Sequence, residues 1–190
     1  GYLREAEAAG QFGEPTRKAI LAMQQAAGLK PDGVAGPYTI GALSSQIYVN
    51  LSQFSLVLVK WDGSTRSYLV AHGTTEHPTP TGSFFVADLA RDPTWIPPDS
   101  PWAQEAKVTP PGPGNPLGTR WIGLDHGAVG IHGTPAGWTV GSRASHGCVR
   151  MTIPDVEDLF EHVDLGTQVR ILEGTEDDPI LGDLWPGSSR

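Results

Sequence analysis

The segment from Ile131 to Met151 contains the residue types that nucleophilic catalysis needs. It holds the only cysteine of the chain, Cys148, together with His132 and His146. A thiol attacks a carbonyl as its thiolate, and a free thiol is mostly protonated at neutral pH because its pKa is about 8.5. A neighbouring imidazole can take up the thiol proton and return it to a leaving amine. The segment therefore predicts a cysteine nucleophile with a histidine partner.

The spacing allows either histidine to be that partner. His146 lies two residues before Cys148, so the two side chains share a face if the segment is extended. His132 is far enough upstream to lie on a neighbouring strand and meet Cys148 across it. Gly147 leaves the backbone N–H groups beside it open to form an oxyanion hole. Arg150 adds a cation that could hold a substrate carboxylate.

Two other interpretations of these residues stay open at this point. Cys148 could be a buried core thiol, with His146 as a structural hydrogen-bonding residue and Arg150 as a surface charge. Alternatively, His126, His132, His146 and Cys148 could ligate zinc, because imidazole and thiolate are common zinc ligands. A single cysteine excludes a disulfide within the chain and a zinc site built from several thiolates.

The composition indicates a folded protein rich in β-structure. Hydrophobic residues make up 38% of the 190 residues, which is enough for a packed core. The 24 glycines and 17 prolines imply many turns and favour a β-rich fold over a helical bundle. A formal net charge of -8 argues against a nucleic-acid partner. No apolar run is long enough to predict a transmembrane helix, and the first residues lack the pattern of a signal peptide.

The first 45 residues show a helical pattern. A helix is predicted over residues 15–28, with proline in its first turn and glycine at its end. A second short helix is predicted within residues 36–43, with Ile40 and Leu43 facing inward. A further short helix is expected over residues 2–9.

Beyond this module the pattern becomes β. Residues 46–50 are interpreted as a linker entering the first strand, and Asp62-Gly63 as a hairpin turn. Strands are predicted at residues 54–59, 67–71, 83–87, 120–124, 128–131 and 167–172. Residues 92–118 are rich in proline and glycine and predict a functional loop, which Trp95 and Trp102 indicate to be ordered and packed.

A helix is predicted directly after Met151. Thr152 or Ile153 is expected to cap it, with Pro154 near its first position. Its buried face is predicted to consist of four residues at helical spacing, Val156, Leu159, Phe160 and Val163. The last residues, 174–190, are expected to form a tail that packs through Leu181, Leu184 and Trp185 or acts as an interaction strap.

The segment around the cysteine resembles a known signature. Ile131-His132-Gly133-Thr134 followed by Ser145-His146-Gly147-Cys148-Val149-Arg150-Met151 is similar to the signature of the L,D-transpeptidase catalytic domain, of the YkuD type. The resemblance extends over about residues 47–173. It includes Thr79-Pro80-Thr81-Gly82, Trp95 with Pro97-Pro98, Gly112 with Asn115-Pro116-Leu117-Gly118, and Gly166-Thr167.

The N-terminal segment resembles the second half of a three-helix peptidoglycan-binding module. The matching residues are Thr16, Ala19, Met23-Gln24, Gly28-Leu29, Asp32-Gly33, Gly36-Pro37, Thr39 and Leu43. The family has an aromatic residue where this chain has Met23, and the resemblance does not extend to the first helix of the module.

The resemblance implies a role for each residue of the signature. Cys148 is expected to be the nucleophile and His132 the general base and acid, with the backbone carbonyl of Gly133 orienting its ring. Ser145, His146 and Gly147 are expected to shape the site, with the N–H groups of Gly147 and Cys148 as oxyanion donors. Arg150 is expected to support the site or to bind the donor's carboxylate. No metal and no cofactor are implied.

The resemblance also implies a fold and a domain order. The fold is expected to be mainly β (α+β overall): a β-sandwich of mixed sheets with one short helix, preceded by a small helical module. The expected boundaries are residues 1–45 for a partial peptidoglycan-binding module, 46–173 for the catalytic domain and 174–190 for the tail.

The implied reaction is acyl transfer between peptidoglycan stem peptides. Cys148 would attack a stem tetrapeptide after its third residue, release D-Ala and pass the acyl group to a second stem as a 3→3 cross-link. With water as acceptor, the same scaffold would be an L,D-carboxypeptidase or L,D-endopeptidase, and a broken Cys/His pair would leave only a wall-binding protein. The implied partners are stem peptides, glycan strands and, as covalent inhibitors, carbapenems. The substrate implies export to the cell envelope.

Overall fold

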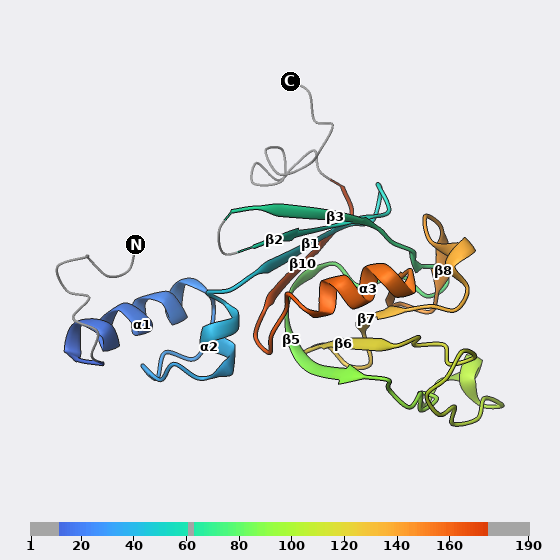
Figure 1. Cartoon of the computed structure of the whole chain (residues 1–190), viewed down its shortest axis with the longest axis horizontal. Coiled ribbons are helices and arrows are strands. Elements are labelled where there is room, and N and C mark those ends of the chain that lie inside the picture. The colour runs from blue at the N-terminus through green and yellow to red at the C-terminus, as the bar shows by residue number, and fades with distance from the viewer. Residues whose placement is uncertain (1–11, 61–62, 175–190) are drawn as a thin grey trace, which may run out of the picture.

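The computed structural model describes residues 12–60 and 63–174 of the chain (Figure 1). A helical module stands beside a larger, strand-rich body that carries one further helix. The expectations for residues 2–9, for Asp62 and for the tail beyond residue 174 lie outside the described residues. Among the described residues, no helix is both long enough and apolar enough to cross a bilayer.

The helical module consists of α1 (Glu14–Ala26) and α2 (Pro37–Gly41), joined by a loop. The buried side chain of Gln24 organises this loop. Its Nε2 lies 3.0 Å from Asp32 Oδ1 and 2.9 Å from Thr39 Oγ1, and its Oε1 accepts from the N–H of Gly33 at 2.9 Å. One amide therefore satisfies polar groups that packing against α1 removes from water.

The prediction that Ile40 and Leu43 face inward is wrong. Their exposed fractions are 54% and 55%, and Thr39 and Gly41 are buried instead. A Cβ at Gly41 would lie 2.3 Å from the carbonyl oxygen of Leu165. Because α2 approaches the backbone of the strand-rich body this closely, its small residues must face inward and its large ones point away.

The strands of the larger body form one mixed eight-stranded sheet in the order β3-β2-β1-β10-β5-β6-β7-β9. They are β1 (Gln46–Asn50), β2 (Ser55–Val59), β3 (Thr65–Leu69), β5 (Gly82–Arg91), β6 (Arg120–Leu124), β7 (Gly130–Gly133), β9 (Val149–Met151) and β10 (Gln168–Leu172). A two-stranded parallel pair, β4 (His72–Gly73) with β8 (Arg143–Ser145), lies beside it. This agrees with the expected mainly-β fold with mixed pairing.

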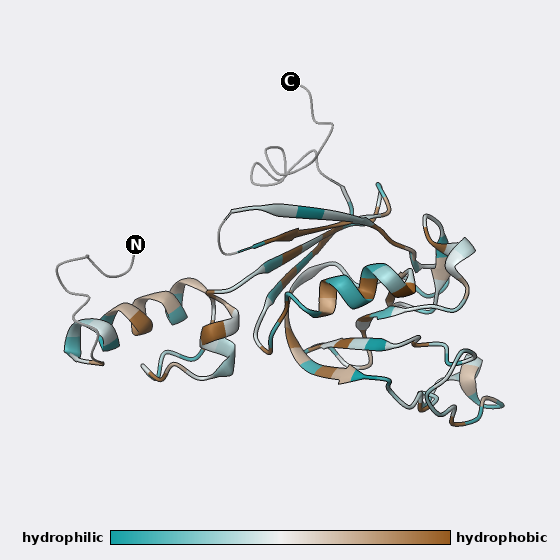
Figure 2. Ribbon diagram, in the orientation of Figure 1, coloured by the Kyte–Doolittle hydropathy of each residue, from teal (hydrophilic) through white to brown (hydrophobic). Residues whose placement is uncertain are grey.

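The long strand β5 divides the sheet into two halves. Its residues 82–85 pair with β10, and its residues from Val86 onward pair with β6, with a register shift between Val86 and Asp88. Such a shift increases the local bend and twist of a strand. The hydrophobic residues of both halves form one common core, which includes Ile47, Leu56, Leu58, Ile122, Ile131, Val149 and Met151. Figure 2 shows hydrophobic residues along the strands of the sheet.

Two predicted segments need correction. Residues 46–50 are not a linker but β1, which pairs in parallel with β10 and antiparallel with β2. The strand predicted at 128–131 begins only at Gly130 and continues to Gly133, so it includes His132. The strand predicted at 83–87 also continues further, to Arg91.

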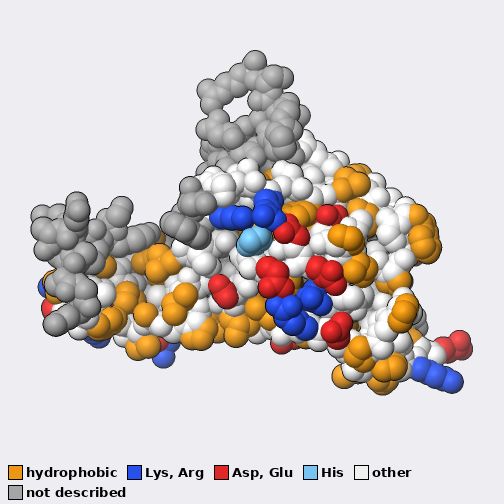
Figure 3. All heavy atoms as spheres, viewed as in Figure 1, with side chains coloured by type: hydrophobic (Ala, Val, Ile, Leu, Met, Phe, Trp, Pro, Cys, Tyr) orange, Lys and Arg blue, Asp and Glu red, His pale blue; other side chains and the backbone are white. Residues whose placement is uncertain are grey.

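The helix α3 (Ile153–Phe160) packs against β6 and β7 and closes the space between the two halves of the sheet (Figure 1). Thr152 caps it by accepting a hydrogen bond from the N–H of Asp155, and all four residues of the predicted apolar face are buried. Polar contacts hold the outer side of α3 to two strands of the sheet. Arg66 and Tyr68 of β3 contact Asp158, and Arg91 of β5 pairs with Glu161 at 2.7 Å. Figure 3 shows acidic and basic side chains gathered on this face.

Candidate active site

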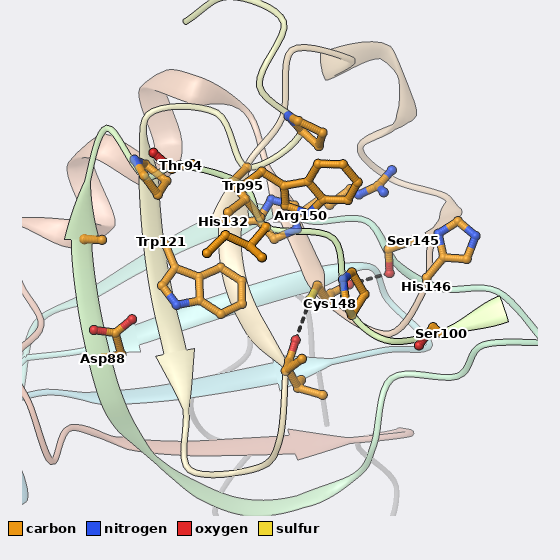
Figure 4. Close-up of a pocket in the computed structure, with 18 of the residues that line it drawn as sticks. Asp88, Thr94, Trp95, Ser100, Trp121, His132, Ser145, His146, Cys148 and Arg150 are labelled. Carbon is orange, nitrogen blue, oxygen red and sulfur yellow. Dashed lines mark hydrogen bonds between the residues drawn. The ribbon is translucent and has the colours of Figure 1, made fainter. Parts of the chain in front are cut away.

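Two adjacent parallel strands bring the predicted nucleophile and base together. In the pairing of β7 with β9, His132 lies opposite Arg150 and Ile131 lies opposite Val149. Cys148 directly precedes β9, so its side chain emerges beside the start of β7. Its Sγ contacts the backbone of this region, donating to the carbonyl of Ala128 at 3.5 Å. Cys148 and His132 line the same cavity (Figure 4).

The ring of His132 is fixed by the backbone next to it. Its Nδ1 lies 2.7 Å from the carbonyl oxygen of Gly133, and the side chain is buried. A carbonyl can only accept, so Nδ1 carries the proton and Nε2 keeps its lone pair. Burial lowers the pKa of His132 to about 4, against a smaller opposing effect of the Gly133 carbonyl. His132 is thus a neutral imidazole at neutral pH, with Nε2 free to accept a proton.

Cys148 rests as a thiol. Burial raises the pKa of the Cys148 thiol, and the backbone at Gly130 and the charge of Arg150 only partly oppose this. The alternative of a core thiol does not explain its position, because the side chain is only half-buried and faces the cavity. The site therefore holds a neutral thiol and a neutral base.

A tight turn after β8 presents the cysteine. Ser145 Oγ donates to the carbonyl of Cys148 at 2.5 Å and accepts from the N–H of Gly147 at 3.2 Å. Gly147 has a φ of +115°, which a residue with a Cβ rarely adopts. The hydroxyl of Ser145 thus stabilises the turn through two backbone groups, the carbonyl of Cys148 and the N–H of Gly147. It also occupies the N–H of Gly147, one of the two groups expected to bind an oxyanion.

Arg150 is a half-buried cation near Cys148. Its Nη1 donates to the carbonyl of Ala144 at 2.9 Å, while its Nε is buried without a hydrogen-bond partner. Burial lowers the pKa of Arg150, and no ion pair with an acidic side chain is found within residues 12–60 and 63–174. An unpaired guanidinium in a cavity can receive an anionic group of a ligand.

His146 also lines the cavity, and its ring contacts the 92–118 loop. Its ring stacks on Trp102 with centroids 4.0 Å apart and an interplanar angle of 12°, and His77 lies 4.8 Å away. Trp102 belongs to a short 3-10 helix, Pro101–Ala103, within this loop. Burial lowers the pKa of His146. The structure therefore gives the two histidines different environments.

The 92–118 loop is ordered by its own polar contacts. Trp95 and Thr109 form a β-bridge, and the buried Asn115 donates to the carbonyl of Pro93 at 2.7 Å and lies 3.1 Å from that of Thr109. These contacts hold the loop as one wall of the cavity, as the tryptophans in it predicted.

The cavity has a volume of about 640 Å³. Its lining joins the predicted site residues to the 92–118 loop and to the face of β5 and β6. The lining side chains that sequence reasoning missed are Asp88, Ala90, Trp121, Ala128 and Val129. The sequence held one signal for Trp121. Gly123 follows it by two residues in the strand predicted at 120–124, so both lie on one face, where the glycine leaves room for the indole.

The zinc alternative finds no support in the arrangement of the side chains. The ring of His126 lies tilted against Phe84 with centroids 5.3 Å apart, and His146 stacks on Trp102. Within the part of the chain that the structure describes, no three His, Cys, Asp or Glu side chains converge as metal ligands would.

The strand order places the thiol of Cys148 and the imidazole of His132 in one cavity on a mixed β-fold. The family model of the YkuD domain, "L,D-transpeptidase catalytic domain", matches residues 44–171. The chain therefore belongs to the L,D-transpeptidase family. The model described as "Putative peptidoglycan binding domain" matches residues 1–43.

Individual relatives agree with this family. The chain is 38% identical over 111 residues to "Putative L,D-transpeptidase YqjB" of Bacillus subtilis (strain 168), covering 56% of this chain and 58% of the relative. It is 31% identical over 139 residues to "Putative L,D-transpeptidase YkuD" of the same strain, covering 73% and 71%. The chain spans about half the length of the first curated relatives it matches.

Solved structures show the same fold. L,D-transpeptidase 3 from Mycobacterium tuberculosis, in complex with a faropenem-derived adduct, superposes with a TM-score of 0.57 at 21% identity, over 68% of this chain and 60% of that chain. The NMR structure of the catalytic domain from the E. faecium L,D-transpeptidase gives a TM-score of 0.54 at 24% identity, over 68% and 98%.

Proposed function

We propose that this protein is a peptidoglycan L,D-transpeptidase that forms 3→3 cross-links through a thioester on Cys148, releasing D-Ala from a stem tetrapeptide. The observation that carries the proposal is that Cys148 and His132 line one cavity, with the ring tautomer of His132 set by the carbonyl of Gly133 at 2.7 Å. Membership of the L,D-transpeptidase family supports the same reaction.

In the first half-reaction, Cys148 Sγ attacks the carbonyl that joins the third stem residue to D-Ala. The thiol proton passes to His132 Nε2 as the S–C bond forms, so a thiolate need not exist before the substrate binds. The imidazolium then returns this proton to the leaving amine, the C–N bond breaks, and D-Ala departs. In the second half-reaction, the side-chain amine of another stem loses a proton to His132 and attacks the thioester. The C–S bond then breaks, and His132 returns the proton to the sulfur of Cys148.

The oxyanion of the tetrahedral intermediates needs backbone donors near Cys148. We assign this role chiefly to the N–H of Cys148 itself, because the N–H of Gly147 already donates to Ser145 Oγ at 3.2 Å. Gly147 and Ser145 then act by holding the turn, and His146 holds it against Trp102 at 4.0 Å. Each of these residues shapes the site without contacting the scissile bond.

Arg150 is proposed to bind a carboxylate of the donor. Its guanidinium is close enough to Cys148 to influence the thiol, and its Nε is buried without a partner. The free carboxylate of the terminal D-Ala is the group of a tetrapeptide that lies nearest to the scissile bond. A charge-assisted hydrogen bond there would position the peptide for attack.

The N-terminal region, matched by the peptidoglycan-binding model, is proposed to keep the enzyme on glycan strands. We accordingly propose the division into residues 1–45, 46–173 and 174–190, with the protein exported to the cell envelope, where its substrate lies. Relatives of this fold are seen with a faropenem-derived adduct and with imipenem. Carbapenems are therefore proposed to acylate Cys148.

The proposal is tested by incubating the protein with disaccharide-tetrapeptides and separating the products by mass spectrometry. Cross-linked dimers and released D-Ala are expected, and neither should form with Cys148→Ala. Accumulation of tripeptide without dimer would identify an L,D-carboxypeptidase. Equal product from Cys148→Ala and from the unaltered chain would refute the assignment of the nucleophile.

A further inference from the structure

The catalytic cavity carries two opposite charges that the proposed chemistry does not both use. Among its lining side chains, Asp88 is the one carboxylate and Arg150 the one guanidinium. In Figure 4 they lie on opposite sides of Cys148. Asp88 is exposed to the cavity, and it makes no hydrogen bond or ion pair with the residues that the structure describes.

Asp88 lies beside the indole of Trp121. Asp88 of β5 pairs with Gly123 of β6, and a Cβ at Gly123 would lie 3.1 Å from Asp88 Cβ and 2.7 Å from Trp121 Nε1. A Cβ at Gly130, the residue that pairs with Gly123 on β7, would lie 2.6 Å from the same indole. Because Gly123 and Gly130 have no side chains, the ring of Trp121 can lie directly against the backbone at these two positions.

The indole extends from Asp88 toward the catalytic histidine. Trp121 pairs with His132 across β6 and β7, with ring centroids 6.0 Å apart. A carboxylate next to an aromatic surface is a combination that binds ammonium groups, because both the charge and the ring quadrupole attract a cation. We propose that Asp88 and Trp121 form a subsite for the side-chain ammonium of the third residue of the donor stem peptide, a deepening that rests on the proposed function.

The distance between Asp88 and Cys148 favours the donor stem peptide over the acceptor stem peptide as the source of the bound ammonium. Cys148 directly precedes β9, so Asp88 of β5 lies three strand spacings from it, roughly 14 Å between backbones at the usual strand spacing. An extended lysine-length side chain spans roughly 7 Å from its carbonyl carbon to its nitrogen, and a hydrogen bond adds about 3 Å. The side chains of Cys148 and Asp88 extend about 2 Å each from the backbone and cover the rest, so a donor whose carbonyl is at Cys148 reaches Asp88 with its ammonium. An acceptor amine held at Asp88 would be too far from the thioester to attack it.

Binding tests this subsite without any chemistry. Cys148→Ala protein is titrated calorimetrically with two stem tetrapeptides that carry L-lysine or L-norleucine at the third position, because norleucine lacks only the ammonium. The lysine peptide should bind about tenfold more tightly, as expected for a hydrogen bond to a charged group. In the Cys148→Ala, Asp88→Asn double variant the two affinities should become equal.

The matched control removes an exposed carboxylate that does not line the cavity. Asp99, in the 92–118 loop, is exposed and absent from the cavity lining. The Cys148→Ala, Asp99→Asn double variant should keep the preference for lysine. Equal binding of both peptides by Cys148→Ala, or a preference that survives Asp88→Asn, overturns the subsite.

Charge reversal gives a second, independent readout. Asp88→Lys should exchange the preference, so that a peptide with the carboxylate side chain of L-2-aminoadipate at position three binds better than the lysine peptide. A preference for lysine that persists in Asp88→Lys contradicts the proposal.

Release of D-Ala separates this inference from the proposed function. A chain that binds the lysine peptide selectively but releases no D-Ala has the subsite without the reaction. A chain that releases D-Ala from the lysine and norleucine peptides with the same kcat/KM has the reaction without the subsite.

Discussion

The environment of Cys148 and His132 favours the uncharged form of both side chains. Burial raises the pKa of the thiol and lowers that of the imidazole to about 4. A thiolate–imidazolium pair would need the reverse shifts. The proton is therefore expected to leave the thiol only during attack, and this has consequences that solution measurements can detect.

The first is the pH dependence of alkylation. The rate of reaction of Cys148 with iodoacetamide should rise with pH and show its inflection above the ordinary thiol pKa of about 8.5. Because Cys148 is the only cysteine, the intact mass of the protein reports this reaction alone. A rate that is already at its plateau near pH 7 would mean that the resting site is an ion pair.

A second consequence is a pH dependence of stability. The pKa of His132 is lower in the folded protein than its ordinary value of 6.5, so the unfolded chain binds the additional proton between these values. Stability is then present above pH 6.5 and is lost as the pH falls toward 4, by up to about 3 kcal/mol. Urea unfolding over this range should show the loss, and His132→Gln should reduce it. An unchanged slope in His132→Gln would place its origin elsewhere.

At the scale of elements, α3 supports the base through Gly133. A Cβ at Gly133 would lie 2.9 Å from Ile153 Cδ1 and 3.0 Å from Val156 Cγ1, so the first turn of α3 packs directly on this residue. The carbonyl of Gly133 is the group that fixes the ring of His132. The position of the imidazole is thus connected to the packing of a helix outside the cavity.

Shortening Val156 should therefore affect both stability and activity. Val156→Ala is expected to cost about 2 kcal/mol of stability and to lower kcat several-fold, because Gly133 loses part of its support. Leu159→Ala is the control, since Leu159 is equally buried in the same helix and its loss should cost about 3 kcal/mol while kcat is retained. Equal effects of both substitutions on kcat, measured well below the midpoint of unfolding, would contradict this connection.

The stack of Trp102 on His146 fastens the 92–118 loop to the turn that presents Cys148. Aromatic stacking contributes about 1 kcal/mol, so Trp102→Ala should raise the population of the open loop several-fold. Trypsin should then cleave faster after Lys107, which lies exposed within this loop. Trp102→Phe should restore most of the protection. The same rate of cleavage in all three proteins would show that the stack does not hold the loop.

Sequence reasoning succeeded where the pattern was local. The spacing of Val156, Leu159, Phe160 and Val163 predicted the buried face of α3, and the segment 120–124 predicted β6 with its bounds. It failed for α2, because that short helix is oriented by a close backbone approach at Gly41 and not by its own apolar residues.

Long-range pairing accounts for the other failures. β1 was interpreted as a linker because its partner β10 is more than a hundred residues away in the sequence. Asp88 and Trp121 remained unnoticed for the same reason, since they reach the cavity only through the pairing of β5, β6 and β7. The signature around Cys148 is different, because its residues are close in the sequence and their types alone indicate the chemistry.

At the scale of the whole molecule, the helical module and the catalytic body are in contact through closely approaching backbone atoms. A Cβ at Gly166 would lie 2.2 Å from the Cα of Tyr38 in α2. Gly166→Ala should therefore separate the module from the body and lower the temperature of unfolding. Gly63→Ala is a suitable control, because Gly63 also has a positive φ but no atom lies within 4 Å of its Cβ position. An equal loss of thermal stability in the two variants would show that strain at φ, and not the contact, is responsible.

The position of β10 has a consequence for the order in which the molecule can form. β10 is the last strand in the sequence, yet it lies inside the sheet between β1 and β5. Until residues 168–172 have left the ribosome, β1 and β5 have no partner on their facing edges, and the core between the two halves of the sheet cannot close. Folding of the catalytic body is thus delayed until its synthesis is complete.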